Sequence, residues 1–111
     1  KIVDYAAKWV EDSFEYQNTP RILPAPLPKK VSDKVKKLVV SAWKALDCHG
    51  YARVDMRLDE KLKPYILEVN LNPDIALWGG FASATSYAGI KYSEFVSKTI
   101  ENAIYEFEKN K

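Results

Sequence analysis

The stretch YARVDMRLDEKLKPYILEVNLN, residues 51–72, decides the fold of this chain. Successive side chains of a strand point to opposite faces, and apolar and polar residues alternate in both halves of this stretch. The pattern predicts two strands joined by the turn 60–63. Arg53, Asp55 and Arg57 share one face of the first strand, and its opposite face is apolar. In the second strand Ile66 is the single apolar residue on the polar face. The apolar rows are Ala52, Val54, Met56 and Leu58, and Tyr65, Leu67, Val69 and Leu71.

The two strands predict a hairpin with a definite register. Pairing Asp59 with Pro64 across the turn sets Asp55 opposite Glu68 and keeps the apolar rows on one face. A register that satisfies both faces is strongly specified, because a slip of one residue exchanges them. The other pairs that this register gives are Arg53 with Asn70, Val54 with Val69 and Met56 with Leu67.

The polar face of the hairpin has two interpretations. Asp55 and Glu68, with Cβ atoms roughly 5 Å apart, repel each other unless a positive group lies nearby. In the first interpretation these carboxylates and the amide oxygen of Asn70 hold Mg²⁺ or Mn²⁺, which prefer oxygen ligands. In the second the face is solvated, and Arg53 and Arg57 neutralise the carboxylates. Asn70 favours the first, because asparagine is depleted in strands.

The rest of the chain predicts helices around this hairpin. Residues 1–9 form an expected strand, 10–19 a polar loop and 20–28 a proline-rich extended connection. Helical spacing of apolar residues begins at Val31 and ends at Leu46, with Gly50 as a stop signal. A short helix is expected over 80–88, and a last one around Phe95 to Phe107, with Ser93 as a candidate cap. These elements predict an α+β fold, with a mostly antiparallel sheet and helices packed on one of its faces.

Composition limits the function classes. At 111 residues, with 47% hydrophobic side chains, the chain is long enough for one domain. A formal net charge of +2 gives no basis for binding nucleic acid or membranes through bulk charge. The single cysteine, Cys48, cannot form an internal disulfide, and with His49 it has no partners at ligand spacing, which favours a core or turn role. Without a signal peptide or apolar span in the sequence, the expected location is the cytoplasm.

Several separated motifs resemble one family in its own order. RVDMRLD (53–59) and PYILEVNLNP (64–73) resemble the carboxy-terminal part of ATP-grasp ligases, most closely the D-alanine:D-alanine ligase branch. Upstream, YAAKW (5–9) is similar to the Y-x-A-K-Y segment of that branch, and AWKALDCHG (42–50) to its A-W-x-x-L-G-C-x-G stretch. Downstream, AGIKYSEF (88–95) is similar to the start of its last helix.

The resemblance implies a function and roles for matching residues. Asp55, Glu68 and Asn70 would be the metal ligands, and Arg53 and Lys8 would contact ATP phosphates, with Arg53 also catalytic. Such ligases phosphorylate a carboxylate with ATP and join the acyl phosphate to an amine. The implied cofactors are ATP and Mg²⁺ or Mn²⁺. The partners would be small carboxylate and amine substrates and the amino-terminal ATP-grasp half of the same chain. Residues 1–111 would then be one carboxy-terminal domain of a longer, active protein. The isolated chain would be inactive.

Departures from the family keep a second function open. Trp9 stands where close relatives have tyrosine, and Asp74 stands where they have glycine. A non-catalytic nucleotide-binding module, or a structural domain of ATP-grasp type, is therefore the alternative. Without the family match, Lys8 reads as a solubilising residue at a strand edge. Neither the donor carboxylate nor the acceptor amine follows from the sequence.

Overall fold

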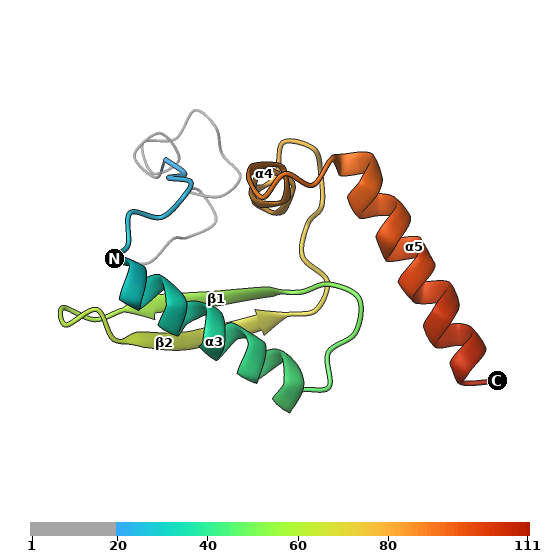
Figure 1. Ribbon diagram of the computed structural model, residues 1–111, viewed down its shortest axis with the longest axis horizontal. Coiled ribbons are helices and arrows are strands. Elements are labelled where there is room, and N and C mark those ends of the chain that lie inside the picture. Colours follow the sequence, from blue (N-terminus) through green and yellow to red (C-terminus); the bar gives the residue numbers. More distant parts are fainter. Residues whose placement is uncertain (1–19) are drawn as a thin grey trace.

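The computed structural model describes residues 20–111 as three helices and a two-stranded antiparallel sheet, an incomplete α+β arrangement. The elements follow in the order α3 (Lys29–Ala45), β1 (Arg53–Leu58), β2 (Pro64–Asn70), α4 (Gly80–Tyr87) and α5 (Tyr92–Lys109). Figure 1 shows α3 crossing in front of the hairpin, α4 above it and α5 running away from α4 toward the C-terminus. The strand predicted over 1–9 and the loop 10–19 lie outside the described residues.

Helix α3 begins two residues before its apolar pattern, at Lys29, and ends at Ala45, before Gly50. Pro28 precedes it, and the Pro28 carbonyl accepts bonds from the backbone N–H groups of Val31 and Ser32. At the other end Asp47 has φ 48° and Cys48 donates its N–H to the Trp43 carbonyl, 3.0 Å away. This is a Schellman-type end with aspartate in the left-handed position. The predicted stop at Gly50 is therefore wrong by three residues.

The hairpin has the predicted pairs near its open end and a different register near its turn. Arg53 pairs with Asn70, Val54 with Val69 and Asp55 with Glu68, as the alternation predicts. The predicted pairs Met56 with Leu67 and Asp59 with Pro64 are wrong. Met56 lies opposite Ile66 and Leu58 opposite Pro64, because the ladder is irregular between Asp55 and Met56.

The irregularity is a β-bulge in which Leu67 is the extra residue. A bulge sets two residues against one and so changes which face the following residues occupy. It places Ile66 opposite apolar Met56, and Leu67 is 62% exposed whereas Ile66 is 36% exposed. Ile66 is the residue that breaks the alternation of β2, so the bulge resolves the one misfit in the sequence pattern. Tyr65 moves with Arg57 to the polar face, where its hydroxyl is 3.3 Å from Asp59.

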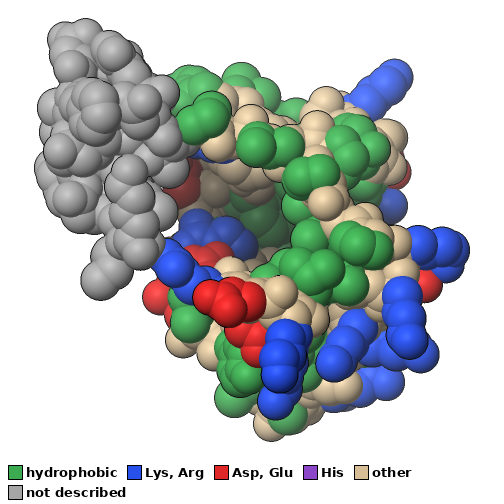
Figure 2. Space-filling view, turned by 90° about the vertical axis from the view of Figure 1, so that its left-hand side faces the viewer, with side chains coloured by type: hydrophobic (Ala, Val, Ile, Leu, Met, Phe, Trp, Pro, Cys, Tyr) green, Lys and Arg blue, Asp and Glu red, His purple; other side chains and the backbone are tan. Residues whose placement is uncertain are grey.

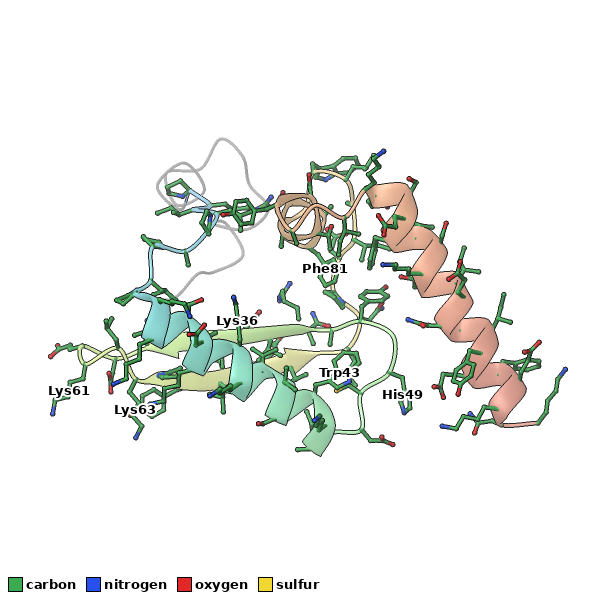
Figure 3. All side chains as sticks on the ribbon, in the orientation of Figure 1. Lys36, Trp43, His49, Lys61, Lys63 and Phe81 are labelled. Carbon is green, nitrogen blue, oxygen red and sulfur yellow. The ribbon has the colours of Figure 1, made fainter. Side chains whose placement is uncertain are left out.

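Aromatic rings join the hairpin to α4 and α5. Tyr51, just before β1, makes edge contacts with Phe81 of α4 and Phe95 of α5, with ring centroids 5.5 and 5.3 Å apart. Figure 3 shows Phe81 pointing from α4 toward the hairpin side of the molecule. Phe95 is buried, and apart from two prolines only Cys48 and Ala82 among the hydrophobic side chains in residues 20–111 are buried with it.

The last helix begins earlier than its apolar pattern suggests. Lys91, with extended backbone angles, is the residue that precedes α5, and its carbonyl accepts a bond from the Phe95 N–H at 2.9 Å. Ser93 lies inside the first turn, so the prediction that it caps the helix is wrong. No helix within residues 20–111 is long and apolar enough to cross a membrane.

Candidate functional site

Four polar side chains lie together on one face of the hairpin. They come from two adjacent cross-strand pairs, Arg53 with Asn70 and Asp55 with Glu68. Residues two apart on a strand share a face, so alternation in β1 and β2 brings the four to one side. We call Arg53, Asp55, Glu68 and Asn70 the hairpin quartet. Lys8, the fifth predicted site residue, lies outside the described part of the chain.

Arg53 forms the centre of the hairpin quartet. Its Nε donates to Asp55 Oδ1 at 2.6 Å and its Nη2 to Asp55 Oδ2 at 2.9 Å, a two-pronged contact within one strand. The same Nη2 is 3.8 Å from Glu68 Oε1 on the other strand. The hydrogen bond to Asp55, with the charges of both carboxylates, raises the pKa of Arg53 above its ordinary value, against a smaller opposing effect of burial. Arg53 therefore stays charged and lowers the repulsion between the carboxylates.

The two carboxylates remain accessible to solvent. The side chain of Asp55 is 36% exposed and that of Glu68 is 57% exposed. Figure 2 shows a hollow in which basic and acidic side chains lie close together, below a rim of hydrophobic ones. Exposure leaves lone pairs on both carboxylates for a further positive group. Within residues 20–111 no three His, Cys, Asp or Glu residues converge on a common point, so a cation here also depends on the amide of Asn70.

Asn70 is held by the loop that follows it. Its Oδ1 accepts a hydrogen bond from the backbone N–H of Asn72 at 2.9 Å. The next turn repeats the arrangement, since Asp74 Oδ1 accepts from the Ala76 N–H at 2.9 Å. Asp74, where the family resemblance led us to expect glycine, thus has a local structural partner. Buried Pro73 lies between the two turns.

The loop continues to α4 through contacts that the sequence pattern did not indicate. Gly79 is buried and donates its N–H to the Ala76 carbonyl at 2.8 Å. Arg21, far away in the sequence, donates from Nη1 to the Trp78 carbonyl at 2.8 Å. The Trp78 side chain itself is 80% exposed. In the sequence, the adjacent glycines 79 and 80 were the available signal for a tight turn here. The hydrogen bond from Arg21 to Trp78 spans 57 residues, so no local sequence pattern indicates it.

Cys48 and His49 have the structural surroundings that their isolation predicted. Cys48 is buried and free, directly after the end of α3. His49 lies between two acidic residues, with Nδ1 3.4 Å from Glu106 Oε1 of α5 and Nε2 3.6 Å from Asp47 Oδ2. These contacts link the α3–β1 connection to the last helix, as the position of His49 in Figure 3 illustrates. They lie at the opposite end of β1 from the hairpin turn.

Comparison with known proteins gives one consistent family. The family model described as "D-ala D-ala ligase C-terminus" matches residues 1–101. A D-alanine–D-alanine ligase from Pelotomaculum thermopropionicum is 36% identical over 93% of this chain and 31% of its own length. One from Leuconostoc citreum is 38% identical over 96% of the chain and 27% of its own length. The chain thus spans roughly three tenths of these curated relatives.

Solved structures agree with the sequence comparison. The crystal structure of the D-alanine–D-alanine ligase from Bacillus anthracis superposes with a TM-score of 0.72 at 31% identity, over 78% of this chain and 28% of that one. The structure of the same ligase complexed with ATP gives the same TM-score and identity over 78% of this chain and 30% of that one. Both the sequence and the arrangement of the elements therefore point to one group of proteins.

Proposed function

The chain belongs to the D-alanine–D-alanine ligase C-terminal family, and we propose that it forms the ATP- and magnesium-binding half of an ATP-dependent carboxylate–amine ligase. Residues 1–111 would be a single domain, the carboxy-terminal half of an ATP-grasp domain. The observation that carries the proposal is the hairpin quartet, in which two opposed carboxylates, an amide and a guanidinium share one exposed face. That combination suits a divalent cation together with a phosphate chain.

The hairpin quartet fits a magnesium or manganese ion by its donor chemistry. Asp55 and Glu68 offer carboxylate oxygens and Asn70 an amide oxygen, which are the ligands that these hard cations prefer. Magnesium commonly takes one or two carboxylates and fills its remaining positions with water and phosphate oxygens. When bound, the cation supplies charge neutralisation for the phosphates.

The proposed reaction has two group transfers. A substrate carboxylate oxygen attacks the γ-phosphorus of ATP and ADP leaves, which gives an acyl phosphate. An amine then attacks the acyl carbon, phosphate leaves and the amine loses a proton, which gives an amide. Arg53 would hold a phosphate oxygen in the first transfer, because its guanidinium presents several donors in a fixed fork. Phosphoryl transfer depends mainly on such positioning and on electrostatic stabilisation.

The other half of the site would come from an amino-terminal ATP-grasp half of the same chain. Lys8 would contact the phosphates beside Arg53, and the amino-terminal half would supply the remaining nucleotide contacts. Small carboxylate and amine molecules are the substrates of this proposal, with D-alanine as the first pair to test because the relatives are D-alanine–D-alanine ligases. An enzyme that consumes ATP works where ATP is kept, so we propose the cytoplasm.

A non-catalytic module is the second candidate, and the Arg53–Asp55 contact favours it. Arg53 already neutralises Asp55 with two short hydrogen bonds. A structural domain that needs only charge neutralisation on this face of the hairpin would have the same contact. The two candidates differ in whether a divalent cation competes with Arg53 for the carboxylates.

Manganese binding separates the candidates. We would titrate the isotope-labelled protein with Mn²⁺, with and without ATP, and follow paramagnetic broadening of amide signals. Broadening centred on the hairpin quartet, reversed by Mg²⁺ and lost in Asp55→Asn and Glu68→Gln, is the result expected for a ligase half-site. Asp33→Asn and Glu94→Gln are matched controls, because they remove exposed carboxylates that pair with Lys29 and Lys98 on helices. Broadening spread evenly over surface carboxylates would favour the structural module.

Turnover separates an enzyme from a module that only binds nucleotide. With the amino-terminal half present, ATP-dependent phosphate release on adding D-alanine should fall at least a hundredfold in Asp55→Asn, because Asp55 would hold the cation that neutralises the phosphates during the transfer. Full activity of Asp55→Asn and Glu68→Gln would show that the assignment of the metal ligands is wrong.

A further inference from the structure

The side-chain amide of Asn70 has a fixed orientation. An asparagine amide has an oxygen end and an NH₂ end of nearly the same shape, and only the oxygen accepts a hydrogen bond. The backbone N–H of Asn72 points at Oδ1 from 2.9 Å. If the amide were turned around, its NH₂ group would face this N–H and two donors would meet. The N–H of Asn72 therefore selects the orientation in which the oxygen faces the loop.

Orientation matters for Asn70 in a way that it does not for the two carboxylates. Asp55 and Glu68 end in two equivalent oxygens, so either rotation of the carboxylate presents an oxygen to a cation. Asn70 presents an oxygen in only one of its two orientations. A carbonyl oxygen has two lone pairs, so Oδ1 keeps one for a ligand while it accepts from Asn72. Of the three candidate ligands, Asn70 is thus the one that needs an orienting partner.

The orienting group belongs to the backbone of Asn72. The Asn72 side chain is exposed, and the hydrogen bond to Asn70 uses its main-chain nitrogen. Buried Pro73 follows directly, and Asp74 closes the next turn by accepting from the Ala76 N–H. The main chain at Asn72 is therefore held on its far side by a buried residue and a second turn.

We propose that Asn72 is a positioning residue whose backbone N–H fixes the oxygen end of the Asn70 amide, so that the second lone pair of Oδ1 can serve the cation of the hairpin quartet, an inference that rests on the function proposed above. Partners that orient metal ligands commonly change metal affinity by about 10- to 100-fold when they are removed. The side chain of Asn72 takes no part in this contact. Removing the backbone N–H should therefore weaken cation binding, whereas removing only the side chain should not.

The test compares Asn72→Pro with Asn72→Ala. Proline removes the N–H, whereas alanine keeps it and removes only the exposed side chain. Mn²⁺ affinity, measured by electron paramagnetic resonance of the free ion, should fall about tenfold in Asn72→Pro and stay within twofold of the parent in Asn72→Ala. In NMR spectra the Asn70 side-chain NH₂ signals should shift and broaden in Asn72→Pro only, with or without metal.

A double substitution distinguishes positioning from a general disturbance of the loop. Aspartate at position 70 offers oxygen at both ends, so in an Asn70→Asp background the Asn72→Pro change should alter Mn²⁺ affinity less than twofold. The same tenfold loss in both backgrounds would overturn the inference, because proline would then act on the loop and not through the amide. Unchanged affinity in Asn72→Pro would overturn it as well.

Failure of this inference can be told apart from failure of the proposed function. If Asp55→Asn and Glu68→Gln weaken Mn²⁺ binding and Asn72→Pro does not, the cation site stands and only the role of Asn72 is wrong. If none of these changes weakens binding, the cation site itself is wrong, and the inference falls with it.

Discussion

Asp55 and Glu68 are directly opposed across the β1–β2 ladder, and the guanidinium of Arg53 contacts both. Opposed like charges destabilise a strand pair unless they are neutralised. The stability of the hairpin, and its capacity for a cation, therefore both depend on Arg53, Asp55 and Glu68.

Replacing Arg53 should destabilise the chain by a modest, salt-dependent amount. We expect Arg53→Ala to lower the free energy of unfolding by about 0.5–1 kcal/mol at low salt, because the pair is partly exposed and such pairs are individually weak. Arg53→Lys should restore only part of the loss, since an ammonium cannot match the two-pronged contact. Urea unfolding at low and high NaCl measures both effects. The exposed pair of Lys98 with Glu94 gives the control Lys98→Ala, and an equal loss there would contradict a special role of Arg53.

Deleting Leu67 should leave the hairpin quartet paired. Leu67 is the extra residue of the bulge, so its removal joins Ile66 to Glu68 and keeps both opposite their present partners, Met56 and Asp55. We expect a folded protein with a less twisted hairpin. Cross-strand NOEs between Val54 and Val69 would remain, whereas deletion of Val69 should remove them. Loss of these NOEs on deleting Leu67 would show that the ladder needs the bulge.

Asp59 should make stability depend on pH in the acid range. Hydrogen bonds from the backbone N–H groups of Lys63 and Lys61 and from the Tyr65 hydroxyl lower its pKa in the folded chain. The unfolded chain therefore takes up a proton first as the pH falls, so this contribution is complete above the ordinary aspartate pKa of 3.8 and is lost progressively below it.

Asp59→Asn tests this dependence because it keeps an acceptor oxygen and removes the titration. Thermal unfolding followed between pH values above and below the ordinary aspartate pKa should show a shallower loss of stability in Asp59→Asn than in the parent. Glu60→Gln, which changes the neighbouring carboxylate of the same turn, is the matched control. An identical pH dependence of the parent and Asp59→Asn would refute the contribution of this turn.

The adjacent glycines before α4 should respond in opposite directions to alanine. A Cβ on Gly79 would lie 2.9 Å from the backbone oxygen of Ala76, whereas the nearest atom to a Cβ on Gly80 is the flexible Arg21 Nε at 3.8 Å. We expect Gly79→Ala to destabilise by about 1–3 kcal/mol, as overpacking does. Gly80→Ala, at the first residue of α4, should stabilise by about 0.4–1 kcal/mol through the unfolded chain. Thermal unfolding of both variants measures the difference, and equal effects would contradict the close approach of Gly79 to Ala76.

The alternation of residues 51–72 was sufficient to predict the part of the fold that carries the candidate site. It gave both strands and the pairs of Arg53 with Asn70 and Asp55 with Glu68, because one polar and one apolar face admit one register. The apolar spacing also predicted α3 and α5, and in α3 the apolar residues of the pattern from Val31 to Trp43 are half-buried, whereas in α5 Ile100, Ile104 and Phe107 are exposed. Their ends were less predictable, since Asp47 stops α3 in a left-handed conformation and Lys91, with no capping side-chain bond, precedes α5.

The bulge and the orientation of Asn70 could not be predicted in the same way. A bulge changes the face of every residue beyond it, and only the misplaced Ile66 signalled one in β2. The contact from the Asn72 N–H depends on how the chain leaves the strand, which has no counterpart in side-chain alternation. The link from Arg21 to the Trp78 carbonyl joins segments far apart in sequence. The roles of Lys8 and of the hairpin quartet in binding stay predictions.

The scarcity of buried side chains has a calorimetric consequence. Apart from two prolines, only Cys48, Ala82 and Phe95 are buried hydrophobic residues between positions 20 and 111, while Ile100, Ile104 and Phe107 of α5 are more than half exposed. The heat capacity change of unfolding scales with the apolar surface that unfolding newly exposes, less a smaller polar term. A chain that keeps so much apolar surface in contact with water when folded should therefore have a flat stability curve and a broad melting transition. Burying α5 against another surface should increase the curvature of the stability curve and narrow the melting transition.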